Sequence, residues 1–349
     1  MPIPDLLRDL LTAAGPSGHE EPASRVWREA ASAFAEVHGD TLGTSFARVG
    51  RNGAATLAIV GHIDEIGLTV THIGSDGLLA YATLGVFDAE IGVGQRVVLA
   101  GNRGPVEGVL ASREVSRRDR SERSSLRHSD LHVDIGAASA EEAAGLVSPG
   151  DPGVWKGEPI ELQNDRIVSK ALDNRLGAYI ALEATRRIGE TARTDLDVVA
   201  VASVQEELGH QGARTAAYSL DPTVAIALDV TWATDVPGAN PRRAGQVDLG
   251  SGAAITRGPT INPHVSDLLA RAAAEEEIPH TFEVYAGRTQ TDADDLSTAR
   301  GGIPTGLVSV PVRYMHTPSE LASLGDVEAA IRLVVAFAAR LTRDTSFLR

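Results

Sequence analysis

The chain has 349 residues, enough for two domains of the usual size of about 150 residues, and its 43% hydrophobic content excludes extended disorder. Asp and Glu (47) outnumber Lys and Arg (32), which gives a formal net charge of −15. This charge argues against nucleic acid or an anionic membrane as the main partner, because both are bound by clustered cations. The absence of cysteine excludes disulfides, thiolate metal sites and cysteine nucleophiles, so any metal site must be built from His, Asp and Glu.

The amino-terminal segment, MPIPDLLRDL, lacks the basic region and the long apolar region of a secretion signal. No apolar run approaches the roughly 20 residues that span a bilayer. We therefore predict a cytoplasmic protein.

The first elements are helical. Apolar residues recur at helical spacing over residues 5–13 and 20–36, and a turn cluster, Gly-Pro-Ser-Gly at 15–18, separates the two predicted helices. The nearly all-apolar run at 54–60 then predicts a strand that is buried on both faces, as in sheets covered by helices.

The pattern changes after about residue 70, where the segments become short, β-rich and glycine-punctuated. The strands predicted there are 78–84, 95–100, 104–110 and 130–135. We expect a small β-rich domain over 70–161, inserted into a discontinuous catalytic domain over 1–69 and 162–349. Within the insert, residues 112–130 carry six arginines and few apolar residues, which favours a solvated loop over a binding patch.

Strands and helices alternate again from Asp173 onward. The predicted helices are 175–188, 209–219, 264–277 and 326–341, and the predicted strands are 196–204, 223–228, 281–285 and 304–310. Such alternation indicates an α/β fold with a mostly parallel sheet flanked by helices.

Acidic and imidazole side chains follow four of these strands. Ligands bind beyond the carboxyl ends of the strands in open α/β sheets, so these side chains are expected to meet at one edge. They are His62 and Asp64 after the first strand, Glu206 and Glu207 after the second, Asp229 after the third and His316 after the fourth. Asp173, just before a predicted helix, can join them.

Two histidines with several carboxylates form a ligand set for divalent ions of the Zn, Co and Mn kind. Two ions about 3.5–4 Å apart need a bridging carboxylate and roughly two further ligands each. Asp173 fits as the bridge, with His62 and Asp229 on one ion and Glu207 and His316 on the other. Glu206 is then free to act as a general base, and Asp64 can hold the second imidazole nitrogen of His62.

Singly, each residue has an ordinary structural explanation. A Glu-Glu pair is usually on the surface, and an aspartate beside a strand or helix commonly serves as a turn residue or an N-cap. A buried histidine is as often structural as it is a ligand. The coincidence of all of them at strand ends favours a functional site. His210, three residues beyond Glu207, is expected to line the cleft without binding metal.

Five ordered motifs resemble those of peptidase family M42, the dinuclear-metal aminopeptidases that include glutamyl and tetrahedral (TET) aminopeptidases. The motifs are GHIDEIG at 61–67, KALDNR at 170–175, VQEELG at 204–209, ALDVT at 227–231 and MHTPSE at 315–320. The likeness extends over nearly the whole chain, including DIGA at 134–137 and PGDP at 149–152 in the insert.

This resemblance implies the same assignments: His62, Asp173, Glu207, Asp229 and His316 as ligands of two metal ions, Glu206 as catalytic base and Asp64 as the residue that orients His62. It further implies hydrolysis of the amino-terminal residue of peptides with a free N-terminus. It also implies a PDZ-like insert that drives dimerisation, and a homo-oligomer that in many members has twelve subunits.

The chain departs from the family pattern in two segments. Residues 113–130 are longer and more basic than the corresponding stretch of the family, which bears on assembly contacts. The segment 287–293 keeps the Thr-Asp-Ala of a specificity loop but not its glycines, so substrate preference cannot be transferred from a relative.

Three other functions remain open at this stage. A glycoside hydrolase can use a carboxylate pair, but aromatic residues are only 4% of the chain and the histidines would be idle. A metal-dependent phosphatase suits the ligands, but the sequence has no glycine-rich phosphate cradle. An inactive metal-binding scaffold would have no need of the intact Glu206.

Overall fold

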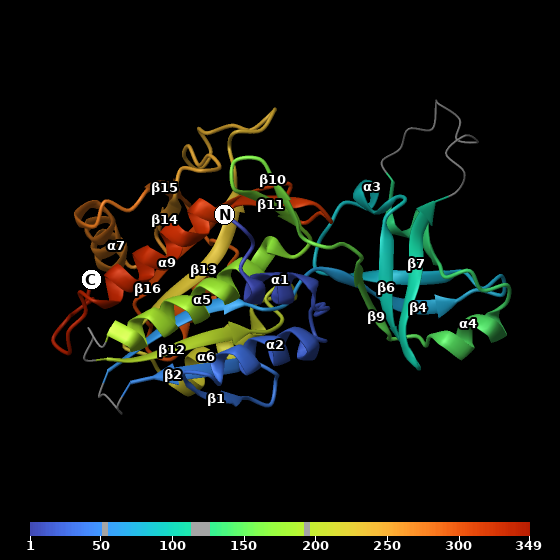
Figure 1. The fold of residues 1–349 in the computed structure, drawn as a ribbon, viewed down its shortest axis with the longest axis horizontal. Helices are drawn as coiled ribbons and strands as arrows, with labels where there is room; N and C mark the ends of the chain where they lie inside the picture. The colour runs from blue at the N-terminus through green and yellow to red at the C-terminus, as the bar shows by residue number, and fades with distance from the viewer. Residues whose placement is uncertain (51–54, 113–125, 192–195) are drawn as a thin grey trace.

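The computed structural model describes residues 1–50, 55–112, 126–191 and 196–349. They form a larger α/β unit and, to one side of it, a smaller β-barrel (Figure 1). Most of the predicted arginine-rich loop, residues 113–125, lies outside the described residues.

Four parallel strands form the centre of the large sheet. Their order is β12 (Asp197–Ser203), β3 (Thr56–His62), β13 (Val224–Trp232) and β16 (Thr305–Arg313). Alternate residues of β3 enter different cores: Leu57 and Ile59 pack on one face, Ala58 and Val60 on the other. The all-apolar sequence of this strand follows from its burial on both faces.

The outer strands are mostly antiparallel, so the prediction of a mostly parallel sheet is wrong outside the centre. These strands are β1 (Glu36–Gly39) and β2 (Ser45–Val49) at one edge, β17 (Glu320–Ser323), β11 (Arg166–Ser169) and β10 (Ile160–Leu162) at the other, and β14 (Ala253–Arg257) and β15 (His280–Val284) beside β16. Of their pairings, only β14 with β15 is parallel. Short connections such as those joining β1 to β2 and β10 to β11 allow only antiparallel neighbours, because a parallel pair needs a crossover of about a dozen residues or more.

Helices cover both faces of the sheet, as predicted (Figure 1). One face carries α1 (Asp5–Thr12), α2 (Glu21–Ala31), α5 (Leu172–Thr191), α7 (Pro263–Glu275) and α9 (Leu324–Ala338). The opposite face carries α6 (Gln211–Leu220) and α8 (Asp292–Thr298). Helix α2 is shorter than the predicted 20–36, because the chain has already entered β1 at Glu36.

The smaller unit is a closed barrel with its own core. Its antiparallel strands are, around the barrel, β4 (Gly67–Ile73), β5 (Leu79–Leu84), β8 (Leu131–Asp134), β7 (Gly104–Ser112), β6 (Arg96–Gly101) and β9 (Pro152–Trp155). Two short helices, α3 (Ala89–Gly92) and α4 (Ala140–Leu146), and a 3-10 turn at His128–Asp130 complete it. A PDZ-like character of this unit stays a prediction.

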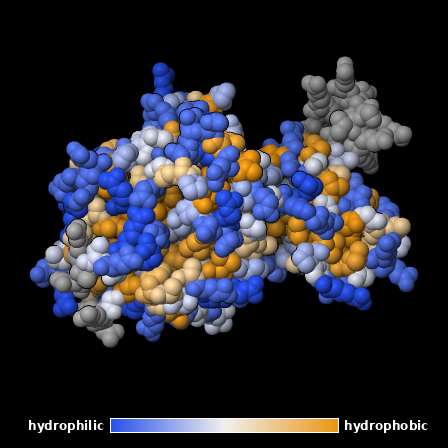
Figure 2. Space-filling model, in the orientation of Figure 1, coloured by the Kyte–Doolittle hydropathy of each residue, from blue (hydrophilic) through white to orange (hydrophobic). Residues whose placement is uncertain are grey.

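Charged and polar side chains cover much of the visible face, with apolar side chains exposed between them on both units (Figure 2). In the described part of the chain, no helix has both the length and the apolar content needed to cross a membrane.

Candidate metal centre

The carboxyl ends of the four central strands bring the predicted residues to one edge of the sheet. His62 is the last residue of β3, Glu206 and Glu207 follow β12, and His316 lies three residues beyond β16. Asp229 lies inside β13, which continues to Trp232, so the prediction that this strand ends at residue 228 is wrong. The residue nevertheless lies at the same edge, because β13 extends past its neighbour β3, whose pairing with it stops at Leu228.

Asp173 reaches this edge from the start of α5. Its backbone is not helical (φ −81°, ψ 105°), although it lies in the first turn. The next side chain, Asn174, donates from Nδ2 to the Leu228 carbonyl at 2.8 Å and accepts from the Gly177 amide at 2.8 Å. The first bond attaches the beginning of α5 to β13, one residue before Asp229, and the second lies within the first turns of α5.

A close backbone approach brings α5 and β3 together. A Cβ atom at Gly61 would lie 2.3 Å from the Gly177 carbonyl carbon, which no side chain can do without a shift of the backbone. The absence of a side chain at Gly61 therefore allows the backbone of α5 to pack directly against the strand that ends in His62.

The imidazoles of His62 and His316 face the two oxygens of one carboxylate. His62 Nε2 lies 3.1 Å from Asp173 Oδ1, and His316 Nε2 lies 3.2 Å from Asp173 Oδ2. Each imidazole has a further carboxylate nearby: Asp229 Oδ1 is 3.9 Å from His62 Nε2, and Glu207 Oε1 is 3.4 Å from His316 Nε2. The other four predicted ligands thus lie around Asp173.

The donor set fits divalent cations. In the described part of the chain, the ligand atoms of His62, Asp173 and Glu207 lie within 4.8 Å of one another, as do those of His62, Glu206 and Asp229. Burial, together with the neighbouring anions, raises the pKa of Glu207 and that of Asp229. Carboxylates crowded at such a buried site are destabilised by one another, and a bound cation would relieve that repulsion.

Hydrogen bonds from two histidines lower the pKa of Asp173, whereas the pKa of Glu207 and that of Asp229 are raised. Burial alone would raise its pKa, but bonds from His316 and His62 lower it. The same contacts raise the pKa of His316 to about 11, against the effect of its own burial. Among the three predicted ligand carboxylates, Asp173 is thus the one whose pKa is lowered.

Asp64 is buried beneath the site and holds the backbone of the Glu-Glu pair. Its Oδ1 accepts the Glu206 amide and its Oδ2 accepts the Glu207 amide, both at 3.1 Å. Its Oδ1 also lies 3.3 Å from His62 Nδ1, although among the described residues this nitrogen has no partner in hydrogen-bond geometry. The clearest contacts of Asp64 thus position the two glutamates.

Glu206 and Glu207 turn in different directions although they are adjacent. Glu207 Oε1 faces His316, whereas Glu206 Oε1 lies 3.2 Å from His210 Nε2. The other oxygen of Glu206, Oε2, lies 3.7 Å from His62 Nε2. Burial raises the pKa of Glu206 to about 7, although the imidazoles of His62 and His210 oppose the shift.

Glu320 is a buried residue of the site that sequence reasoning did not assign. Its Oε2 accepts the Asp173 amide at 2.9 Å, and its Oε1 accepts the His316 amide at 2.8 Å. It therefore fixes the backbones of two predicted ligands. Its position four residues after His316, within the last of the five motifs, was the signal that could have identified it.

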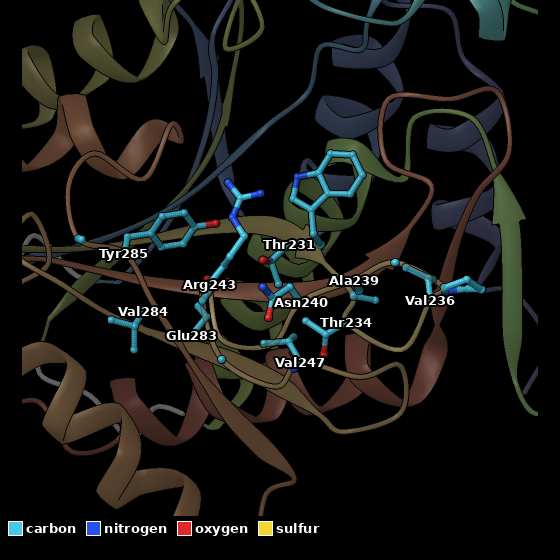
Figure 3. A pocket seen from close by; sticks show the side chains of 17 residues that line it. Thr231, Thr234, Val236, Ala239, Asn240, Arg243, Val247, Glu283, Val284 and Tyr285 are labelled. Carbon is cyan, nitrogen blue, oxygen red and sulfur yellow. Dashed lines mark hydrogen bonds between the residues drawn. The ribbon is translucent and has the colours of Figure 1, made fainter.

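A cavity of about 620 Å³ lies beyond Asp229. Thr231, two residues further along β13 and on the same side of the strand, lines it together with Trp232, Asn240, Arg243 and Tyr285. Figure 3 shows Arg243 and Tyr285 extending into the same part of this cavity. Burial raises the pKa of Tyr285 to about 12, and the nearby Glu283 and Asp229 add to the shift.

The chain is similar to known proteins in sequence over most of its length. The sequence model of the family described as M42 glutamyl aminopeptidase matches residues 43–333. A putative aminopeptidase of Acetivibrio thermocellus is 36% identical over 95% of this chain and 97% of its own. The lysyl aminopeptidase of Pyrococcus furiosus is 33% identical over 95% of each chain.

Solved structures show the same relationship. A TET aminopeptidase from a marine sediment archaeon of the Thaumarchaeota superposes with a TM-score of 0.93 at 34% identity, over 97% of this chain and 96% of the other. The TET1 peptidase of Pyrococcus horikoshii, described as assembling into a tetrahedron or a large octahedral shell, superposes with a TM-score of 0.85 at 27% identity, over 97% and 99%. Matched across nearly its whole length, this chain belongs to the M42 aminopeptidase family.

Proposed function

We propose that this aminopeptidase removes the amino-terminal residue of peptides at a centre that binds two divalent metal ions. The single observation that carries the proposal is the position of Asp173. Its two carboxylate oxygens face different imidazoles, at 3.1 and 3.2 Å, and each imidazole has a second carboxylate beside it. One carboxylate shared between two ligand groups is the arrangement that a two-ion site requires.

His62 and Asp229 would hold one ion, His316 and Glu207 the other, and Asp173 both. Zinc suits these ligands best, and cobalt and manganese also suit them. When bound, the ions would supply a Lewis acid for the scissile carbonyl and lower the pKa of the attacking water.

Glu206 would act as the general base. Its Oε2 faces the ligand cluster and is not engaged by His210, so it is available to accept a proton from water as the oxygen of that water attacks the carbonyl carbon. The same carboxyl group then donates this proton to the leaving amine as the C–N bond breaks. The burial of Glu206, which disfavours its charged form, favours the uptake of this proton.

The cavity beyond Asp229 would receive the side chain of the amino-terminal residue. It begins at Thr231, two residues from the predicted ligand Asp229 on the same strand, a separation of about 7 Å at the usual rise of a strand. The surrounding carboxylates would attract the ammonium group of the substrate.

A homo-oligomer built from dimers is the assembly we propose, with the barrel as the dimerisation unit. The relationship to the TET1 peptidase and the apolar side chains exposed on the barrel support this proposal. Dimers could assemble further into a twelve-subunit particle, which sedimentation or mass photometry would distinguish from a dimer.

The test is release of p-nitroaniline from a panel of aminoacyl-p-nitroanilides. The protein is stripped of metal and reconstituted separately with Zn, Co and Mn, with carboxymethylcellulose as a parallel substrate. Release restored by metal is the expected result and reveals the preferred ion and side chain. Hydrolysis of the cellulose alone, or no release with two ions bound per subunit, would overturn the proposal.

A further inference from the structure

The carboxylate of the predicted base, Glu206, is held by a histidine that has no place among the predicted ligands. Within the described residues, the side-chain partners of this carboxylate are His210 at 3.2 Å from Oε1 and His62 at 3.7 Å from Oε2. His210 lies just before α6, and its side chain is only 12% exposed. The contact with His210 fixes which oxygen of Glu206 remains turned toward the ligand cluster.

His210 is itself held from behind. Its Nδ1 lies 2.7 Å from Asp295 Oδ2 in helix α8, and Asp295 Oδ1 accepts Nε of Arg214 in helix α6 at 3.0 Å. The imidazole is therefore clamped between two carboxylates from different elements, and it donates to both when it carries both ring protons. Burial alone would lower the pKa of His210, but Glu206 and Asp295 raise it to about 9.

The clamp explains how two adjacent glutamates are given different tasks. Asp64 holds both backbones in the same way, so it cannot distinguish the side chains. The difference lies in their carboxylates: Glu207 turns to His316, and Glu206 turns to His210. A carboxylate whose Oε1 is occupied by an imidazole has one oxygen left for the substrate side.

We propose that His210, held by Asp295, is a positioning residue that fixes the carboxylate of Glu206 for proton transfer. This inference rests on the proposed aminopeptidase function. His210 acts through Glu206, contacts no predicted metal ligand, and sets the orientation of the base rather than the composition of the metal site.

The test compares His210→Ala, Asp295→Asn, the double variant and a conservative His210→Gln variant with the wild type. His264→Ala serves as the matched control, since His264 is exposed on α7, away from this cluster. We expect kcat to fall about 10- to 100-fold in His210→Ala, because a misplaced catalytic group typically lowers the rate by such a factor. KM should stay within twofold of the wild-type value, and two ions should still be bound. The double variant should be no slower than His210→Ala, because both changes break one chain of contacts.

Two readouts separate positioning from a purely structural role. Added imidazole should restore part of kcat in His210→Ala but none in Glu206→Gln, and His210→Gln, which keeps a donor, should be faster than His210→Ala. A kcat loss with no rescue by imidazole or by glutamine, or with additive losses in the double variant, would overturn the proposal.

The crystal structure of His210→Ala supplies a readout independent of activity. We expect the Glu206 carboxylate to rotate away from its wild-type orientation while the other site residues stay in place. An unchanged Glu206 would contradict the positioning role even if the wild type cleaved no substrate of the panel. Failure of the aminopeptidase proposal and failure of this inference are therefore distinguishable.

Discussion

At the scale of single residues, the chemistry depends on how carboxylates are partnered. Asp173 is stabilised as an anion by two imidazoles, whereas burial raises the pKa of Glu206 and that of Glu207. Glu320 uses both of its oxygens on the backbones of Asp173 and His316. The carboxylates thus divide into groups that hold the site together and groups that face its centre.

Glu206→Gln should abolish turnover without loss of metal. The amide has nearly the same shape but cannot accept a proton from water, so kcat should fall by about 10²–10⁴-fold, the usual contribution of a general base. Steady-state kinetics and metal analysis of the same preparation measure both quantities. The matched variant Glu207→Gln should instead lose bound metal. Full activity of Glu206→Gln would refute the role of Glu206 as general base.

At the scale of elements, the position of α5 controls the site. This helix touches β3 through the Gly61–Gly177 approach and is tied to β13 through Asn174. Since His62 ends β3 and Asp173 lies in the first turn of α5, a shift between these two elements changes the distance between the imidazole of His62 and the carboxylate of Asp173. Helix α9 has a comparable anchor at its first turn, where Asp326 accepts the amides of Gly250 and Gly252 at 2.7 and 2.8 Å.

Gly61→Ala should therefore weaken both folding and metal binding. The new Cβ would lie 2.3 Å from a backbone carbon, and forcing extra volume into a packed interior costs about 1–3 kcal/mol. Urea denaturation and metal titration measure the two effects. Gly145→Ala in helix α4 is the control, since its Cβ would meet no atom within 4 Å, and this variant should be as stable as the wild type or slightly more so.

Asp326 should give the protein a pH-dependent stability that Asp326→Asn lacks. Burial raises the pKa of this carboxyl group to about 6, above its value of about 3.9 in an unfolded chain. The folded protein therefore binds the proton more tightly, and the stability this provides is complete below about pH 4 and lost as the pH rises through 6.

The wild type should lose about 3 kcal/mol relative to Asp326→Asn between pH 4 and pH 7, since two pKa units correspond to that energy. Chemical denaturation of both proteins across this range measures the difference. A difference in stability that does not change with pH would show that the carboxyl group has an unshifted pKa.

At the scale of the whole molecule, a buried cluster joins the segments that meet where the chain enters the barrel. Glu65, two residues before β4, accepts both Lys170 at 2.8–2.9 Å and Arg175 at 3.1 Å, together with the Gly15 amide at 3.1 Å. All three charged side chains are almost completely buried. Arg175 also donates to the carbonyls of Leu10 and Ala13 and so connects the end of α1 to α5.

Glu65→Gln should destabilise the folded protein by about 3–5 kcal/mol. Removal of the carboxylate that contacts both cations would leave Lys170 and Arg175 buried without their shared ion-pair partner, and breaking a buried ion pair from one side costs about this much. Denaturation monitored by circular dichroism measures the loss. Glu107→Gln, which breaks the exposed pair with Lys156 on the barrel, should cause no measurable change; equal effects of the two variants would contradict the argument.

The sequence by itself determined the central architecture and the site composition. A strand such as β3, which is buried on both faces of the sheet, requires a continuous run of apolar residues. Where His, Asp or Glu follows such runs, the sequence predicts that metal ligands gather at the carboxyl edge of the sheet, even when no contact is known. The ordered motifs also indicated the family to which the chain belongs. These features are local in the sequence, so periodicity and spacing are sufficient to find them.

Only the tertiary structure decided the direction of the outer strands, the extent of β13 beyond Asp229, and the partners of the buried polar groups. The contacts of Glu320 with Asp173, of Asp295 with His210 and of Glu65 with Lys170 join residues 85 to 147 positions apart. No periodicity links such residues, because their proximity arises from the packing of separate helices and strands. The sequence therefore determines which side chains are available, whereas packing determines which of them meet.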